Sequence, residues 1–508
     1  MTKHEAASEN QEPIDSRKIA VLDIGSNSFH LVVVKCSETR VETLNKLKQK
    51  VRLAEGLSDE DYLSEEAIRR GLEALKMFEK KIKDFAPDSV RIVATYTLRR
   101  AKNAHKFIKA ARKIISYPVE IIFGQEEARL IYNAVAYTNS LEDSNLVIDI
   151  GGGSTEFALG NAKAPKVLRS LDMGCVSFTQ RFFADGVLTE ARFHQAITAA
   201  RQQLAYIENN FTQIGWQQCL GTSGSIESMI SMYCDDLEFC EHSLTLPQLE
   251  NLKDYCLERG EIDRLELGEV NKLRTQVFPA GLAIMIAIFQ SLRVDSLNYV
   301  TSALREGVIY EMDDVLRHHD IREGSVSTLA SRYQVELEHA EQVAKTCFQL
   351  YEMAKDDWEL QDLRVKPLLG WAAQLHEIGL YVQSRGVQKH SYYILKHADL
   401  HGFNAEQQAF MAMLTRFYRK KIQLADIPEL TQFRQIELLQ CLILLRMSAI
   451  LNVRRNPQLA PNVELDVDDH SISLTFPTGW LKQHTVTAAN LKNESEYLLD
   501  IGFKLSFQ

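Results

Sequence analysis

The sequence predicts an α/β protein made of two related halves, followed by a mostly helical region and a small α+β end piece. Two observations support this prediction. Segments 19–35 and 146–159 each contain an apolar run, Asp-Ile-Gly, a short turn and a second apolar run. Beyond about residue 315 the apolar residues take helical spacing. We therefore expect the following parts: a flexible tail at 1–17, halves at 18–136 and 137–314, a helical domain at 315–455 and an α+β piece at 456–508.

The composition is that of a globular chain with several domains. The 508 residues are 45% hydrophobic and 25% charged, which is more chain than one core normally uses. The apolar stretches 281–289 and 438–445 are too short to cross a bilayer and predict buried helices. Eight scattered cysteines without a CxxC pair indicate a reducing compartment. We expect the cytoplasm, with the inner membrane face as a second location.

The net charge of −10 argues against a general affinity for nucleic acid or anionic lipid. A polyanionic substrate would therefore need local basic groups. Lys46, Lys48, Lys50 and Arg52 recur at every second position, so in a strand they emerge on one face. A solvated strand face is the ordinary explanation, but four cations without an intervening acid favour contact with an anion.

The two halves follow a similar order of elements. In the first half, apolar runs around the turn at 25–27 predict a hairpin, and a third strand follows near 41–53. Helices are expected from Ser64, from about 100 and from about 125, with strands at 90–95 and 119–123 between them. The second half repeats the hairpin from Leu146 and continues with a strand near 166–170, a helix over 190–209 and a strand ending at 221.

Glycine and hydroxyl residues in both predicted hairpin turns are suited to binding phosphate. Consecutive backbone amides without bulky side chains form a concave anion site, and helix N-termini and arginine also bind phosphate. One such turn is weak evidence, whereas a matched pair is stronger. The candidate phosphate-binding residues are Ser26, Asn27, Ser28, Arg99, Gly151, Gly152, Gly153, Ser154, Thr155, Gly224 and Ser225.

Three acidic residues of the hairpins are candidates for a magnesium site. Asp149 ends a buried strand and Glu156 begins the returning strand, so a tight hairpin brings the two carboxylates together. Magnesium prefers one or two carboxylates, water and substrate oxygens. Asp23 occupies the corresponding place in the first half. The alternative is that Asp149 only accepts hydrogen bonds from turn amides.

Glu126 and Glu127 lie where a strand leads into a helix. Adjacent helical positions point about 100° apart, so only one of the two carboxylates can face a cleft. Acids in a first turn ordinarily stabilise the helix dipole. A carboxylate facing bound phosphate would instead be a base that orients or deprotonates water.

The helical region contains the sequence Leu375-His376-Glu377, with further histidines at 390, 397 and 401. It resembles a metal-dependent phosphohydrolase helix. Such sites have aspartate directly after the histidine, and Glu377 departs from that pattern. We therefore interpret this segment as structural, with a second metal site as the alternative.

Together these segments resemble the exopolyphosphatase/guanosine pentaphosphate phosphohydrolase family, which has the duplicated actin-like fold of the sugar kinases and Hsp70. The resemblance runs from about residue 19 to near the end. It rests on DIGSNSFHL (23–31), KVRLAEGL (50–57), TLRRAKN (97–103), GQEEARLIY (124–132), VIDIGGGSTE (147–156), MGCVSF (173–178), GTSGS (221–225) and ALREGVIYEM (303–312).

The resemblance implies roles for individual residues. It makes Glu127 the catalytic base, Asp149 and Glu156 metal-associated carboxylates, and both hairpin turns phosphate binders. It also implies that the helical region is a degenerate metal-phosphohydrolase (HD-like) module that contributes to a homodimer and to a channel for polyphosphate. Ser302 stands where the family pattern has glycine, which leaves a nucleotide contact at that loop open.

The resemblance leads us to predict an exopolyphosphatase that releases terminal orthophosphate from inorganic polyphosphate with activated water and Mg²⁺. K⁺ or another monovalent cation is an open alternative as a second ion. The second prediction is hydrolysis of guanosine pentaphosphate (pppGpp) to ppGpp, and the third is a non-catalytic alarmone-binding regulator. For polyphosphate we expect a basic path formed by Lys46, Lys48, Lys50, Arg52, Arg419, Lys420 and Lys421.

Overall fold

The computed structural model divides the chain into two compact units, residues 1–319 and 320–508. It describes residues 17–36, 41–139, 141, 143–162, 164–233, 243–267, 274–317, 321–456 and 461–508. The predicted tail, apart from residue 17, and the cysteines at 234 and 240 lie outside these residues. Each unit is described by itself below.

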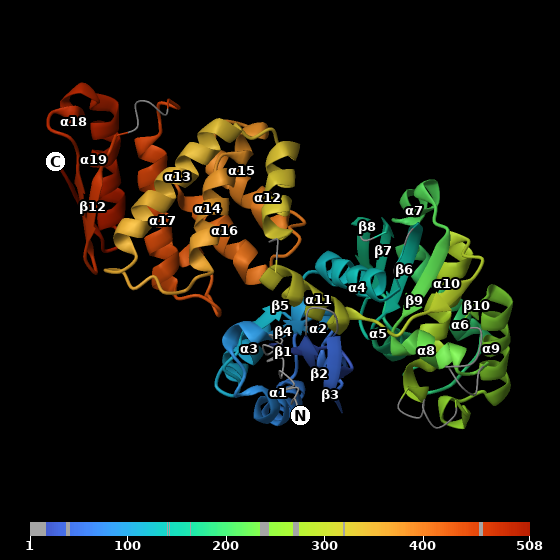
Figure 1. The fold of residues 1–508 in the computed structure, drawn as a ribbon. Coiled ribbons are helices and arrows are strands. Elements are labelled where there is room, and N and C mark those ends of the chain that lie inside the picture. The colour runs from blue at the N-terminus through green and yellow to red at the C-terminus, as the bar shows by residue number, and fades with distance from the viewer. Residues whose placement is uncertain are drawn as a thin grey trace, which may run out of the picture. The chain divides into compact units, whose positions relative to one another are not determined.

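The first sheet of unit 1 contains five strands in the order β3-β2-β1-β4-β5 (Figure 1). Its hairpin pairs β1 with β2 antiparallel, and β4 continues the sheet parallel to β1. The predicted first-half order βββαβαβα is found, except that two short helices lie between β4 and β5 where one was expected. The strands are β1 (Arg17–Ile24), β2 (Ser28–Cys36), β3 (Val41–Lys50), β4 (Val90–Ala94) and β5 (Val119–Ile121).

The second sheet repeats this arrangement, in the order β10-β11-β9-β6-β7-β8. Hairpin β6-β7 is antiparallel and β9 pairs parallel with β6, as β4 does with β1. In both hairpins the aspartate faces the residue seven positions later: Asp23 pairs with His30, and Asp149 with Glu156. The predicted internal repeat is confirmed. The strands are β6 (Ser144–Ile150), β7 (Thr155–Asn161), β8 (Ala164–Leu171), β9 (Gln218–Thr222), β10 (Ser243–Leu244) and β11 (Leu297–Tyr299).

Helices cover both sheets of unit 1 (Figure 1). The first begins as predicted, because the Ser64 hydroxyl accepts a hydrogen bond from the Ala67 amide. The helices are α1 (Glu65–Ile82), α2 (Tyr96–Arg100), α3 (Ala104–Ala111), α4 (Gly124–Asn139), α5 (Cys175–Phe182), α6 (Glu190–Leu204), α7 (Glu208–Ile214), α8 (Gly224–Ile230), α9 (Leu246–Arg259), α10 (Phe278–Leu292) and α11 (Leu304–Arg317).

The predicted buried helix at 281–289 is the centre of α10. In the described residues, the stretch Thr275–Leu292 alone has the length and apolar composition of a membrane span, and 78% of it is buried inside the protein. Its side chains belong to the core of the second half. The stretch is therefore explained as a core helix.

Two helices join the halves of unit 1 through a buried charge network. Helix α4 packs on strands β6, β7 and β8, while α11 packs on α4 and on β1. Arg129 of α4 pairs with Glu126 at 2.7 Å and with Glu311 of α11 at 2.8 Å. Glu311 also pairs with Arg91 of β4 at 2.9 Å. The network therefore fixes both helices against the first sheet.

Unit 2 contains helices around one hydrophobic core and a three-stranded sheet. The two short strands predicted near the end are β12 and β13, and β14 pairs parallel with β13 as an additional strand. The elements are α12 (Ile321–Arg332), α13 (Leu337–Ala354), α14 (Val365–Leu375), α15 (Val387–His397), α16 (Ala405–Phe417), α17 (Gln435–Leu451), β12 (Glu464–Val467), β13 (Ser471–Thr475), α18 (Trp480–Gln483), α19 (Thr485–Leu499) and β14 (Lys504–Phe507).

The described cysteines are buried in the two units. Cys175, Cys219, Cys256, Cys347 and Cys441 are free thiols, and Cys36 is likewise buried. Burial raises the pKa of the Cys347 thiol to about 12 and that of Cys256 to about 12. These cysteines therefore contribute to packing.

A buried ion pair joins α17 to α19 in unit 2. Arg446 is 0% exposed and its Nη2 donates to Glu494 at 2.7 Å, while Nη1 donates to the Phe417 carbonyl. A guanidinium removed from water this completely needs its carboxylate, because an uncompensated buried charge is costly. The ion pair therefore favours one arrangement of α17 against α19.

We expect Glu494→Gln to lower the free energy of unfolding of unit 2 by about 3–5 kcal/mol, because it leaves Arg446 buried without its anion. Lys421→Gln is the control. Its pair with Asp500 is exposed on both sides, so it should change the free energy by less than about 1 kcal/mol. Urea unfolding followed by tryptophan fluorescence checks both variants, since three of the four tryptophans lie in unit 2. Equal effects would contradict the assignment.

Candidate active site

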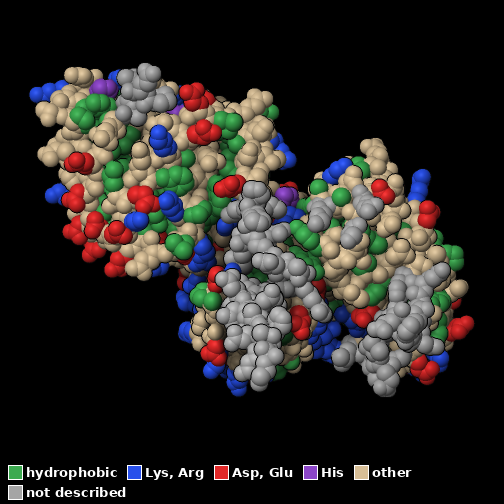
Figure 2. Space-filling view, viewed as in Figure 1, with side chains coloured by type: hydrophobic (Ala, Val, Ile, Leu, Met, Phe, Trp, Pro, Cys, Tyr) green, Lys and Arg blue, Asp and Glu red, His purple; other side chains and the backbone are tan. Residues whose placement is uncertain are grey.

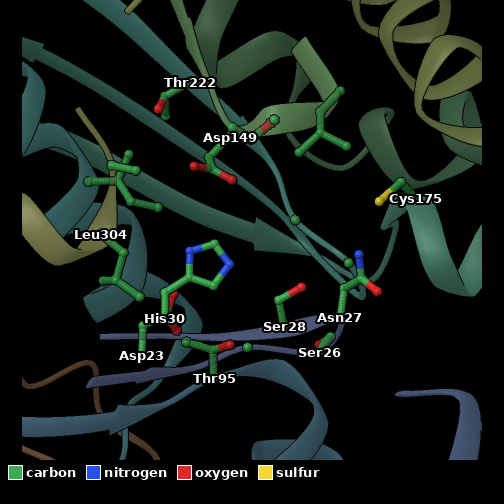
Figure 3. Close-up of a pocket in the computed structure, with 18 of the residues that line it drawn as sticks. Asp23, Ser26, Asn27, Ser28, His30, Thr95, Asp149, Cys175, Thr222 and Leu304 are labelled. Carbon is green, nitrogen blue, oxygen red and sulfur yellow. The ribbon is translucent and has the colours of Figure 1, made fainter. Parts of the chain in front are cut away.

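A pocket of about 360 Å³ lies in unit 1 where the two halves meet. Both hairpin turns line it, as do the first turn of α4, the start of α8 and the start of α11. Figure 3 shows Ser26, Asn27, Ser28 and Asp149 around this pocket. The repeated elements of the sequence are thus brought to one place.

The two hairpin turns are in direct contact. A Cβ at Gly152 would lie 2.9 Å from the Cβ of Ser26, and one at Gly153 would lie 2.0 Å from the Tyr96 ring. A Cβ at Gly174 would lie 2.4 Å from the backbone of Gly152 and Gly153. These glycines therefore permit backbone to approach backbone, which is the condition for an anion site made of amides.

Asp23 and Asp149 line the pocket from the two sheets. Burial is the largest cause of the raised pKa of each, to about 7. The neighbouring Glu127 adds to the rise at both carboxyls, and Arg305 opposes it. Acids buried together in this way are unstable as free anions and are stabilised by a cation.

Glu127 lines the same pocket from the first turn of α4 and pairs with Arg99 at 3.0 Å. Burial raises the pKa of Glu127, while Arg99 works in the opposite direction. Its neighbour Glu126 points elsewhere and forms the buried pair with Arg129. The expectation that one of the two carboxylates faces the cleft is met by Glu127.

Basic groups from distant parts of the chain complete the pocket. Arg305 contacts His30 Nδ1 at 2.9 Å and lies 3.6 Å from Asp23. Burial lowers the pKa of His30 to about 2, so this imidazole is neutral. Lys48 and Arg274 also line the pocket, and burial lowers the pKa of Lys48. These cations offset the negative charge of a polyanionic ligand.

Most predicted turn and acid residues line the pocket. They are Asp23, Ser26, Asn27, Ser28, Glu127, Asp149, Gly151, Gly152, Gly153, Ser154 and Gly224. Their roles remain predictions, since position alone does not test them.

Four of the residues predicted to bind phosphate or metal do not line the pocket. Thr155 is fully buried and donates to the Met173 carbonyl, and Ser225 donates to the Ile150 carbonyl at 3.2 Å. Their hydroxyls are engaged in hydrogen bonds within the fold, and their assignment as phosphate ligands stays a prediction. Glu156 accepts from Ser170 at 2.8 Å beside Asp149, and Arg99 reaches the site through Glu127. The Glu156 and Arg99 side chains therefore lie next to pocket residues but do not line the pocket themselves.

The seven residues of the predicted basic path lie in different units of the chain, four in unit 1 and three in unit 2. Lys46, Lys48 and Lys50 alternate on β3, but the strand ends at Lys50 and Arg52 has a φ of 52°. The prediction of one strand face therefore fails for Arg52, which pairs with Glu55. Of the three lysines, Lys48 lines the pocket.

The remaining three residues of that path belong to unit 2. Arg419 and Lys420 line a cavity there, and Lys421 pairs with Asp500 at 3.0 Å. On the face of unit 2 seen in Figure 2, acidic and basic side chains are interspersed. Several acidic side chains gather along the lower left edge of that face.

Sequence reasoning missed several pocket residues. Arg274 packs over Gly224, where an added Cβ would lie 2.0 Å from the guanidinium. Thr222 donates to the Ser302 carbonyl at 2.6 Å, and the Ser302 hydroxyl accepts from Thr138 at 2.8 Å. Serine is thus accommodated where the family pattern has glycine. Arg305 at a helix start was a visible signal, whereas nothing local marks Arg274.

The donor set fits a hard divalent cation. Asp23 Oδ1 is buried and has no hydrogen-bond partner within the described residues, and Asp149 and Glu127 line the same pocket with raised pKa values. Carboxylate oxygens are the ligands that Mg²⁺ prefers. These residues therefore suit the expected magnesium ion.

Two family models match nearly the whole described chain. The Ppx/GppA phosphatase family matches residues 32–316, and domain III of the Ppx/GppA phosphatases matches residues 321–495. The first match contains the pocket, and the second lies within unit 2. The predicted resemblance and enzyme class, a phosphoanhydride hydrolase, are confirmed.

Curated relatives are similar over their full length. A Vibrio atlanticus protein named guanosine-5'-triphosphate,3'-diphosphate pyrophosphatase is 39% identical over 96% of this chain and 98% of its own. An Aeromonas hydrophila protein of the same name is 36% identical over 95% and 97%. These names overturn our first prediction: exopolyphosphatase as the main function is wrong. The basic path for polyphosphate stays a prediction.

Solved structures agree with the fold of unit 1. The crystal structure of an exopolyphosphatase from Cytophaga hutchinsonii is 26% identical with a TM-score of 0.54, covering 59% of this chain and 98% of that one. The Aquifex aeolicus Ppx/GppA family member is 25% identical with a TM-score of 0.50, covering 60% and 100%. The predicted duplicated actin-like fold is confirmed. From the family models and the full-length relatives together, the chain belongs to the Ppx/GppA phosphatase family.

Proposed function

We propose that this protein hydrolyses the terminal 5′ phosphoanhydride bond of guanosine pentaphosphate, which yields guanosine tetraphosphate and orthophosphate. The observation that carries the choice of substrate is the name shared by relatives that are 36–39% identical over at least 95% of the chain. The pocket supports the chemistry, since it combines two amide-rich turns, a carboxylate base and several cations.

The two hairpin turns hold the terminal phosphate through their backbone amides and the hydroxyls of Ser26, Ser28 and Ser154. Arg305, Lys48 and Arg274 add positive charge on the opposing walls. Positioning and charge neutralisation supply most of the rate in phosphoryl transfer. The dense contact between the turns fixes these donors before the substrate arrives.

Glu127 acts on the attacking water. Its carboxylate accepts a proton as the water oxygen bonds to the terminal phosphorus, and the bond from that phosphorus to the bridging oxygen breaks. Arg99 at 3.0 Å orients Glu127 and opposes the rise in its pKa that burial causes. A Mg²⁺ ion held by Asp149 and Asp23 would neutralise charge on the phosphate oxygens when bound.

The first prediction concerns the base. Glu127→Gln should lower turnover roughly 10²- to 10⁴-fold while preserving substrate affinity, because the amide keeps the shape but accepts no proton. Phosphate release measures turnover, and equilibrium binding of guanosine pentaphosphate measures affinity. Glu66→Gln, also in a first helical turn but exposed, is the control. Turnover like the wild type in Glu127→Gln would remove this role.

The second prediction concerns the metal. Asp149→Asn should raise the magnesium concentration needed for half-maximal activity, because a neutral amide is a poorer ligand for a hard cation than a carboxylate. A magnesium titration of phosphate release checks this, with Asp172→Asn, outside the pocket lining, as the control. An unchanged titration would return Asp149 to a turn-stabilising role.

The third prediction tests the substrate. The kcat/KM of the purified full-length chain should be higher for guanosine pentaphosphate than for long-chain polyphosphate when both are assayed for phosphate release under the same conditions. The converse ranking would reject the proposed substrate. Binding of guanosine pentaphosphate without any release would instead identify a non-catalytic regulator.

A further inference from the structure

Unit 2 contains a cluster of two histidines and a carboxylate that the proposed reaction does not use. His339 lies in the first turn of α13, and His376 and Glu377 directly follow α14. One ligand atom from each of the three residues lies within 4.8 Å of the others. All three line two cavities, of about 320 and 430 Å³, so the cluster forms a wall shared by both.

The orientation of His376 leaves one ring nitrogen available as a ligand. Its Nδ1 lies 2.6 Å from the Ala373 carbonyl oxygen. A carbonyl only accepts, so Nδ1 carries the proton and the neutral ring has its lone pair on Nε2. Metal-binding histidines are commonly fixed in this way by a backbone carbonyl. His376 is 1% exposed, which favours the neutral ring.

His339 provides an independent sign that a ligand is bound here. The residue is 8% exposed, and its Nδ1 is buried without a hydrogen-bond partner within the described part of the chain. Its Nε2 lies 3.7 Å from Glu377 Oε2, beyond hydrogen-bond distance. Buried polar atoms are rarely left unsatisfied. A cation bound between the three side chains would provide the polar partner that the buried His339 side chain lacks.

We propose that His339, His376 and Glu377 bind a first-row transition-metal dication, with zinc as its best representative. Two imidazoles and one carboxylate are a common protein donor set for zinc, and imidazole nitrogen favours such ions over magnesium. The site is therefore chemically distinct from the oxygen-rich pocket of unit 1. It is independent of the proposed substrate.

Arg455 is the feature that makes the proposal testable. It pairs with Glu377 Oε2 at 2.5 Å and also with Glu336. The contacts of Glu377 with His339 and with Arg455 both use Oε2, so Oε1 is the oxygen that would bind the ion. The competing explanation is that the Arg455 guanidinium itself serves as the cation of the cluster. If the cluster binds a metal, removing Arg455 should strengthen metal binding. If Arg455 is itself the cation, a metal should bind only after Arg455 is removed.

Zinc binding to the chelator-stripped full-length chain tests the proposal by equilibrium dialysis and metal analysis. We expect His376→Ala and His339→Ala each to bind one equivalent less than the wild type. His397→Ala, an exposed histidine of the same unit, should bind the wild-type amount. Asp149→Asn should keep the equivalent too, which separates this site from the pocket of unit 1. Circular dichroism and the melting temperature establish that each variant is folded.

Arg455→Gln provides the second measurement, which does not depend on the stability of the histidine variants. Removing a cation beside the ion should tighten zinc binding by roughly tenfold, because it removes the repulsion between two like charges at close range. A wild type that binds no more zinc than His376→Ala would overturn the proposal. So would a site that appears only in Arg455→Gln, because Arg455 would then be the resident cation. Cobalt should give a visible absorption band in the wild type that is lost with His376→Ala.

Discussion

The pocket of unit 1 depends on the close contact between the two hairpin turns. Because Gly152 carries no Cβ, its backbone approaches Ser26 of the other half within a distance that a methyl group would occupy. This contact sets the separation between the strands that carry Asp23 and Asp149. It also aligns the amides of both turns toward one volume. A larger side chain there would separate the halves and enlarge the pocket.

The charge network behind the pocket determines how α4 presents its first turn. Glu126 is held by Arg129, which Glu311 of α11 also holds, and Arg91 ties Glu311 to the first sheet. The next residue, Glu127, therefore projects from a helix whose rotation is already determined. A buried network of this kind contributes little net stability compared with apolar packing, but it specifies one geometry. The position of the Glu127 carboxylate follows from it.

Local sequence patterns predicted what depends on neighbouring residues. The hairpins and the repeated Asp-Ile-Gly turns follow from strand periodicity, and helix periodicity shows that Glu126 and Glu127 cannot both face the cleft. The choice of Glu127 came from the family resemblance. Arg274, His30 and His339 were missed because their roles arise only from tertiary contacts. Thr155 and Ser225 lie in the right turns, yet their hydroxyls bond to backbone carbonyls. The substrate was mispredicted because the shared motifs bind phosphate and do not distinguish what carries it.

The repeat also shows where the halves diverged. Asp149 faces Glu156 across its hairpin, whereas the matching Asp23 faces His30, which is neutral and bonded to Arg305. A duplicated pocket with identical halves would accept a linear polyanion equally well in two opposite directions. Here one half carries an extra acid and the other an imidazole with an arginine. The two halves therefore differ in charge, and this difference favours one of the two directions for a polyanion bound in the pocket.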